Sequence, residues 1–409
     1  MRRFLFTSIL AAASTAAAMA QTIYICKDGS YTAQEITDGL DISLDQGIDS
    51  VTFHRPVIEK TVSIAYNGST AQVTIPSSVD GVTCTSGSSS DVALDITNTS
   101  DEIVFDVTGS TTDGSLTISG NYKLTIRLNG VSITSSKTAA INIACGKRIA
   151  IVMADGSTNT LVDAASGQQK ACLYTKGHIE LSGAGTLNVT GNANHAIASK
   201  EYFQVKRSVK AINILKAAND AIHAGQYIQV NGGEINITGT TTNDALQAEY
   251  KLDDNGNIIQ DEENTGAIVV KGGTFNIDLN NAEDAKGLKA EGNIVISGGI
   301  FAINACSNGS RGMQTDANMS ISQADAATSI VINAKGGKCT VAEDAADPHK
   351  CMGMKIDGDL TVNDAAIEVY NTGKKAKGIK VKGTCTINGA VKGSGTINEG
   401  NIKATIDNN

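Results

Sequence analysis

Acidic residues recur at fixed places around a repeated phrase, where they could bind a hard cation. The phrase reads Lys286-Gly-Leu-Lys-Ala-Glu in one copy, and its second place holds a small residue in every copy. The acids lie either four residues after this small residue or one to three residues before it: Glu249, Glu291, Asp316 and Asp357 after it, and Asp220, Asp244 and Asp284 before it. Stacked carboxylates repel one another unless a cation lies between them, and calcium prefers several carboxylate oxygens. These seven residues are therefore the predicted calcium ligands, in two separate lines.

Basic residues accompany the acids, one residue before or two residues after the small residue. They are Lys286, Lys289, Arg311, Lys355, Lys377 and Lys380. A basic stripe flanked by acids on one β face suits a ligand that carries carboxylates and hydroxyls. The alternative is an ordinary charged surface, in which each acid faces a lysine from a neighbouring turn. We expect the small residue and the residues two and four places after it to share the outward face.

The small residue recurs with a nearly constant period. Its copies are Ala196, Ala221, Ala245, Gly287, Gly312, Gly353 and Gly378, at spacings of 25, 24, 42, 25, 41 and 25. Each unit contains three short segments with apolar residues at every second position, separated by glycine turns. Repeats of this length with three such strands predict a parallel β-helix, with two insertions and about eleven rungs of about 25 residues. The first insertion contains Asn255-Gly256, which predicts a hairpin turn.

The N-terminus predicts export. Arg2 and Arg3 precede an apolar run that ends in Ala18-Met-Ala, which is typical of a secretory signal peptide. We therefore divide the chain into a signal peptide (1–20), a small N-terminal β segment (21–75) and a β-helix (76–409). We expect a protein that is periplasmic, cell-surface or secreted, without a membrane span.

The overall composition excludes some functions and leaves others open. With 33 basic and 42 acidic residues, the net charge of -9 disfavours nucleic-acid binding. The eight cysteines show no zinc-binding spacing, so we interpret most as small buried hydrophobes, with one or two disulfides possible. Tyr202 and Tyr227 share one place of the repeat, which indicates structural stacking more than a sugar platform. His195 and His223 are interpreted as solvated or packing residues. We expect a monomer.

Several phrases resemble a family of exported bacterial proteins described as carbohydrate-binding domain-containing. They include Asn129-Gly-Val-Ser-Ile-Thr-Ser, Lys176-Gly-His-Ile-Glu-Leu-Ser-Gly-Ala-Gly-Thr-Leu-Asn-Val and Lys286-Gly-Leu-Lys-Ala-Glu. Residues 22–55 resemble the N-terminal segment common in exported Bacteroidetes proteins. The resemblance implies a right-handed, calcium-binding parallel β-helix shaped like pectate lyases, whose relatives bind cellulose and acidic plant polysaccharide. It also implies calcium ligands among Asp220, Asp244, Asp284, Glu249, Glu291 and Asp316.

Together these observations favour a non-catalytic, calcium-binding β-helix that binds acidic plant glycan or cellulose. One alternative is a calcium-dependent, pectate-type lyase, in which the resemblance gives Lys289 the role of the base. Another is a structural or adhesive surface protein.

Overall fold

A computed structural model describes residues 22–27, 30–35, 50–53, 60–97, 102–339, 349–371, 377–388, 391–394 and 402–403. The predicted signal peptide lies outside these residues. The described part is built of β-strands, with no helix in it, and so has no helix long and apolar enough to span a membrane. The chain divides into two compact units, residues 1–60 and 61–409.

The first unit contains a three-stranded antiparallel sheet. Its strands are β1 (Thr22–Lys27), β2 (Ser30–Glu35) and β3 (Ser50–Thr52). The central strand β1 pairs with β2 and β3, so this part of the predicted N-terminal segment is β structure. The second unit begins earlier than residue 76, because β4 (Thr61–Asn67) pairs in parallel with β8 (Ile103–Thr111). The side chains of Val62 and Ile64 are fully buried in the solenoid core, so burial places this segment in the second unit.

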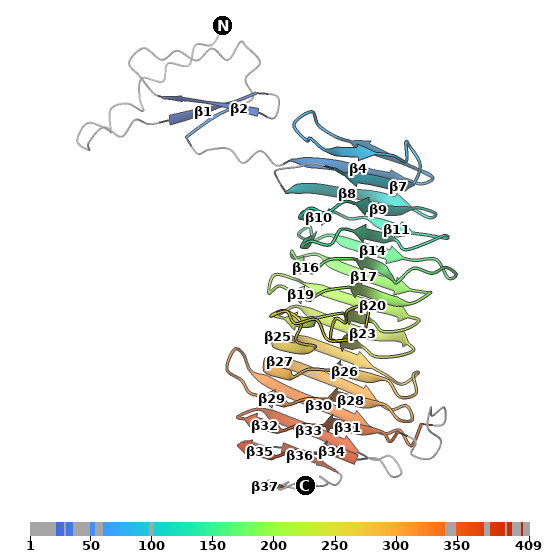
Figure 1. The fold of residues 1–409 in the computed structure, drawn as a ribbon, viewed down its shortest axis with the longest axis vertical. Helices are drawn as coiled ribbons and strands as arrows, with labels where there is room; N and C mark the ends of the chain where they lie inside the picture. Colours follow the sequence, from blue (N-terminus) through green and yellow to red (C-terminus); the bar gives the residue numbers. More distant parts are fainter. Residues whose placement is uncertain are drawn as a thin grey trace, which may run out of the picture. The chain divides into compact units, whose positions relative to one another are not determined.

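The second unit is a parallel β-helix in which strands from successive repeats lie one above another (Figure 1). The strands with the repeated phrase form one twelve-stranded sheet, which we call the repeat sheet. Its strands are β6 (Val82–Cys84), β7 (Asp91–Ile96), β9 (Ser115–Ser119), β12 (Ile141–Ala144), β15 (Ala171–Thr175), β18 (His195–Ser199), β21 (Ile222–Ala224), β24 (Leu246–Ala248), β26 (Lys286–Ala290), β28 (Arg311–Thr315), β31 (Met352–Ile356) and β34 (Lys377–Val381).

The second and third strands of each rung form two further ladders. One contains β10 (Leu124–Leu128), β13 (Ile149–Met153), β16 (Ile179–Ser182), β19 (Phe203–Val205), β22 (Tyr227–Val230), β29 (Met319–Ile321), β32 (Leu360–Asn363), β35 (Cys385–Asn388) and β37 (Ile402–Lys403). The other contains β11 (Ser132–Thr134), β14 (Thr158–Val162), β17 (Thr186–Gly191), β20 (Ala211–Ala217), β23 (Glu234–Thr241), β30 (Thr328–Ala334), β33 (Ala366–Asn371) and β36 (Val391–Ser394). The long strands β8 (Ile103–Thr111), β25 (Ala267–Asp278) and β27 (Ile294–Ala305) take part in both, and β5 (Thr70–Thr74) forms a hairpin with β4.

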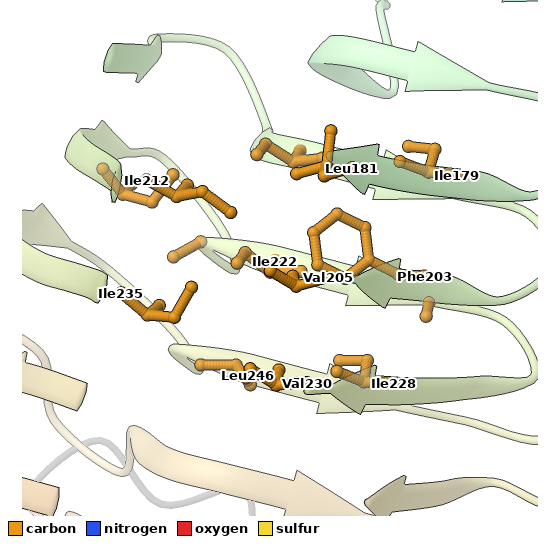
Figure 2. Packing of buried hydrophobic residues seen from close by; sticks show 14 of the residues in the cluster. Ile179, Leu181, Phe203, Val205, Ile212, Ile222, Ile228, Val230, Ile235 and Leu246 are labelled. Atoms are coloured by element: carbon orange, nitrogen blue, oxygen red, sulfur yellow. The ribbon is translucent and has the colours of Figure 1, made fainter. Parts of the chain in front are cut away.

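The core consists of columns of similar apolar side chains. In one column Ile179, Phe203 and Ile228 occupy paired positions of three successive strands, and Figure 2 shows them stacked inside the helix. The apolar alternation of the sequence produces these columns, because every second side chain of a strand faces inward. Fully burying such a side chain contributes about 1.5–3 kcal/mol.

Outside the core, asparagines form ladders from rung to rung. The side-chain amide of Asn213 donates to Asn188, Asn236 donates to Asn213, and Asn276 donates to Asn236, over 2.7–2.9 Å. Each amide both donates and accepts, so the column satisfies itself without water. These ladders help to keep the rungs in register.

The small residue of the repeated phrase faces the core, contrary to the expected outward orientation. The ladder pairs Lys286 with Arg311 and Leu288 with Met313, and skips the small residue between them. Both the small residue and its successor are therefore buried, and the alternation restarts after them. A Cβ on Gly287 would lie 2.4 Å from the carbonyl oxygen of Gly312 and 3.2 Å from Cγ2 of Ile303, which explains why this copy has Gly at the small position.

The first insertion, between β24 and β25, is a hairpin, as Asn255-Gly256 predicts. Leu252 and Ile258 form an antiparallel bridge, and Gly256 has a φ of 81°. The Asp253 carboxylate accepts the backbone N–H groups of Asn255 and Asn257 at 2.9 and 2.8 Å, closing the turn. The insertion leaves the register unchanged, since β24 still pairs with β26.

Candidate functional site: the charged face of the repeat sheet

Three columns of polar side chains run along the repeat sheet. The leading column precedes the small residue: His195, Asp220, Asp244, Lys286, Arg311, Met352 and Lys377. The central column lies two residues after it: His223, Gln247, Lys289, Gln314, Lys355 and Lys380. The trailing column lies four residues after it: Glu249, Glu291, Asp316, Asp357 and Lys382. The ladder irregularity at the small residue turns the leading and central columns to the same side, since His223 contacts Asp220 of its own rung.

The leading column is a buried row of charges. Asp244 is 1% exposed, and it follows Asp220, which is 2% exposed. Burial and the neighbouring Asp220 raise the pKa of the Asp244 carboxyl to about 6, although the charges of Lys286 and Lys289 oppose this. The ammonium of Lys286 lies 3.8 Å from an Asp244 oxygen, so the acid and the base of adjacent rungs partly compensate each other.

Asp284 contributes its carboxylate to the same row from a loop. Its backbone has a φ of 57°, a left-handed conformation that few residues other than glycine adopt. Its oxygens lie 3.3 Å from Lys286 Nζ, 3.7 Å from Arg311 Nη2 and 2.8 Å from His349 Nδ1. Asp284 therefore neutralises the buried bases of two rungs.

Asp220 lies between two histidines of successive rungs. Its Oδ2 is 3.1 Å from Nδ1 of His195 and 3.1 Å from Nδ1 of His223, and the two imidazoles stack with ring centroids 4.5 Å apart. Burial alone would raise the pKa of Asp220, but the two histidine hydrogen bonds hold it well below its usual range. Burial lowers the pKa of His223, but the hydrogen bond to Asp220 and the charges of Asp220 and Glu249 together outweigh this, and the net shift is upward.

Lysines gather at the end of the face formed by β31 and β34. Lys355 and Lys382 lie 3.1 and 2.9 Å from oxygens of Asp357. Burial, followed by the charges of Lys377, Lys355 and Lys382, lowers the pKa of Lys380. Four lysines and one carboxylate share this end of the face, so it attracts anions.

The seven acids predicted as calcium ligands do not gather at one point. Four of the acids face basic or histidine side chains, as the alternative of an ordinary charged surface predicts: Asp220, Asp244, Asp284 and Asp357. In the trailing column, Glu249 contacts Gln247 and lies 3.7 Å from His223 Nε2, while Glu291 accepts the Tyr250 backbone N–H at 2.7 Å. The six predicted ligand-binding bases all lie in the leading and central columns. Lys289 is half-buried, between Gln247 and Gln314.

The residues that sequence reasoning missed are His195 and His223. Within the described residues, His195, Asp220 and His223 are the one group of three potential metal ligands whose ligand atoms all lie within 4.8 Å of one another. The two histidines are 28 residues apart, which is one rung of 25 plus the three residues between the leading and central columns. Aligning the repeats by column, with both columns facing outward, would have revealed the pair.

Two other groups of residues are structural. Tyr202 and Tyr227 stack with centroids 4.8 Å apart, and Tyr202 is 7% exposed, which supports the structural interpretation of this stack. Burial raises the pKa of the Tyr227 phenol to about 12.

The cysteines at 84, 145, 172, 306, 351 and 385 form no disulfide.

Comparison with known proteins identifies the family. The sequence model of the carbohydrate-binding domain-containing proteins matches residues 90–390, most of the solenoid. The chain belongs to this family. A family member from Acetivibrio thermocellus is 29% identical over 112 residues, which make up 25% of this chain and 39% of that protein. The chain thus matches well under half the length of that relative.

A solved structure supports the β-helix fold of this family member. It is described as the polysaccharide lyase-like protein from C. thermocellum, in a gadolinium derivative. The superposition covers 65% of this chain and 98% of that chain, with a TM-score of 0.52 and 22% sequence identity. At this level of identity the likeness concerns the fold alone.

Proposed function

We propose that the repeat sheet binds an acidic polysaccharide on the outer face that carries its central and trailing columns. The observation that carries this proposal is the lysine cluster of β31 and β34, where Lys355, Lys377, Lys380 and Lys382 lie at one end of the face and two of them contact Asp357. Polymer carboxylates would meet the half-buried and exposed lysines of this cluster. Membership of the carbohydrate-binding domain-containing family supports this choice of ligand class.

Binding measured on the full chain tests the proposal. Polygalacturonate should bind, and raising the salt concentration should weaken it because the contacts are between exposed charges. A neutral polymer such as cellulose should bind more weakly. The absence of retention on any acidic or neutral glycan would refute the proposal and favour an adhesive or structural role. Formation of an unsaturated uronate during the incubation would instead show lyase activity.

Calcium binding is part of this proposal at one place only. Glu249, Glu291 and Asp316 follow one another on three rungs, and no Lys or Arg of the described part of the chain forms a salt bridge with them. The three carboxylates do not all lie within 4.8 Å of one another, so the acids of two neighbouring rungs would supply the oxygen ligands that calcium prefers. Asp220, Asp244, Asp284 and Asp357 fit calcium poorly, because basic or imidazole groups already contact their oxygens.

The predicted right-handed winding with about eleven rungs and the predicted export complete the proposal. An experimental structure would test the winding. N-terminal sequencing of protein recovered from outside the cytoplasm would test export, with cleavage after Ala20 as the expected result.

A further inference from the structure

His195, Asp220 and His223 form a three-membered group with nitrogen and oxygen atoms directed at one another. Both histidine Nδ1 atoms lie 3.1 Å from the same Asp220 oxygen, and all three ligand atoms lie within 4.8 Å of one another. In a tetrahedral zinc site the metal–ligand bonds of 2.0–2.1 Å give ligand–ligand separations of about 3.3 Å. The spacing of the three side chains therefore leaves room for one ion after a small adjustment.

The group is held in place by its surroundings. The other carboxylate oxygen of Asp220 accepts the backbone N–H of Asp244 at 3.0 Å, which leaves Oδ2 for the two histidines. The backbone N–H of Asp220 lies 3.3 Å from His195 Nδ1, and this nitrogen can accept it when unprotonated, which is the form that binds metal. Nε2 of His223 lies 3.7 Å from Glu249, a carboxylate placed to orient the imidazole.

The chemistry of the three ligands selects the kind of ion. Two imidazoles and one carboxylate suit zinc, copper or nickel, whereas calcium takes an all-oxygen shell. Asp220 is 2% exposed, while the His195 and His223 side chains are 13% and 20% exposed, so the open side of the group faces solvent. Three protein ligands leave a coordination position for water or for a ligand group.

We propose that His195, Asp220 and His223 form a binding site for a divalent transition-metal ion, with zinc as the reference ion. The site spans two rungs of the repeat sheet, β18 and β21, and fixes their spacing. It does not depend on the proposed glycan binding, since no lysine of β31 or β34 takes part. The competing arrangement is a metal-free group in which both imidazoles donate hydrogen bonds to Asp220.

Calorimetric titration with zinc alone tests this site. The full chain without an affinity tag is treated with a chelator, exchanged into metal-free buffer and titrated. We expect saturable binding of a single zinc ion per chain. Cobalt in place of zinc should give the visible absorption of a nitrogen-ligated ion, and an excess of calcium should displace neither metal.

Variants then locate the ion. Losing an orienting residue of a metal site costs 10- to 100-fold in affinity, so losing a ligand in His195→Ala or Asp220→Asn should weaken zinc binding by at least about 100-fold. His178→Ala is the matched control, because His178 also faces a carboxylate, Glu201, but lies outside the group. Circular dichroism verifies that each variant is folded.

The outcomes separate the two arrangements. Failure of the wild-type chain to bind zinc, or displacement of zinc by calcium, would overturn the proposal even if a variant failed to fold. Unchanged zinc affinity in folded His195→Ala would overturn it too, because the ion would then lie elsewhere. Since no glycan is present in any arm, these results are independent of polysaccharide binding.

Discussion

The backbone N–H of Lys286 donates to Oδ1 of Asp244 at 2.7 Å, and the Lys286 ammonium lies 3.8 Å from the same oxygen. The two residues are 42 positions apart in the sequence but adjacent in the leading column. Both are buried, so the charge of each depends on the other.

Replacing Lys286 by methionine should destabilise the protein. The change leaves Asp244 buried beside Asp220 without its nearest base, and breaking a buried pair typically costs several kcal/mol. We expect a loss of about 2–4 kcal/mol of unfolding free energy in urea at neutral pH. Lys289→Met on the same strand is the control, since Lys289 is half-buried and its loss should change stability by at most about 0.5 kcal/mol. Equal effects of the two substitutions would contradict the importance of the buried column.

Gly312→Ala should destabilise the protein through overpacking. A Cβ at Gly312 would lie 2.6 Å from the Gly353 carbonyl oxygen and 2.6 Å from Cγ2 of Ile332. We expect a cost of about 1–3 kcal/mol, measured by thermal and urea unfolding. Gly146→Ala is the matched control, because its added Cβ would meet its nearest neighbour at an ordinary 3.6 Å. If Gly312→Ala left the unfolding free energy unchanged, the strands would have to move apart easily at this place.

Glu201 should make stability dependent on pH in the acid range. Burial raises its pKa, but hydrogen bonds from His178 and from Lys251, the latter at 2.7 Å, lower the pKa to about 2. Because the folded pKa lies below the unfolded value of about 4.3, the stabilisation is present above that value and is lost as pH falls towards 2. Glu201→Gln should therefore cost about 2 kcal/mol near pH 6 and progressively less below pH 4.

Melting curves of wild type and of Glu201→Gln, each taken near pH 6 and below pH 4, give the measurement. Glu262→Gln, at an exposed position of the insertion, should leave the curves unchanged. A gap between wild type and Glu201→Gln that stays constant with pH would argue against the depressed pKa.

Removing lysines from β31 and β34 should weaken binding of polygalacturonate. The double variant Lys355→Ala/Lys380→Ala loses two cations of the cluster, and we expect a fall in affinity of roughly 10-fold at low salt, which shrinks as salt is added. Affinity electrophoresis measures it. Lys271→Ala, an exposed lysine of β25 outside the repeat sheet, serves as the control. Equal retardation of all variants would move the glycan to another face.

Calcium should raise the melting temperature if the trailing column binds it. An ion that binds the folded state stabilises it by RT ln(1 + [L]/Kd), about 2.7 kcal/mol at 100 times Kd. Glu291→Gln should abolish most of the calcium-dependent increase, because Glu291 is the middle acid of the three. Melting curves that are identical in calcium and in chelator would remove calcium from the proposed function.

The repeat predicted the three-strand rungs and the columns of charge, because apolar alternation and a constant period determine which side chains stack. Burial of Lys286 and Arg311 could not be predicted in this way. The period of the repeat indicates which side of a strand a residue faces. It does not indicate that Asp284, a loop residue in a left-handed conformation, contacts these two bases.

The orientation of the small residue was wrong for a related reason. An uninterrupted alternation was assumed, whereas the ladder skips Gly287 and Gly312. The same irregularity brings Asp220 and His223 to one side, which an uninterrupted alternation does not predict.

The hairpin between β24 and β25 has a consequence for how the chain folds. Gln247 pairs with Lys289 across 42 residues, whereas Lys289 pairs with Gln314 across 25. Loop-closure entropy grows only with the logarithm of loop length, so the longer closure costs only about 0.5 kcal/mol more. The contact order of the solenoid therefore stays close to one rung throughout, and ordering can spread from rung to rung past the insertion with almost no added barrier.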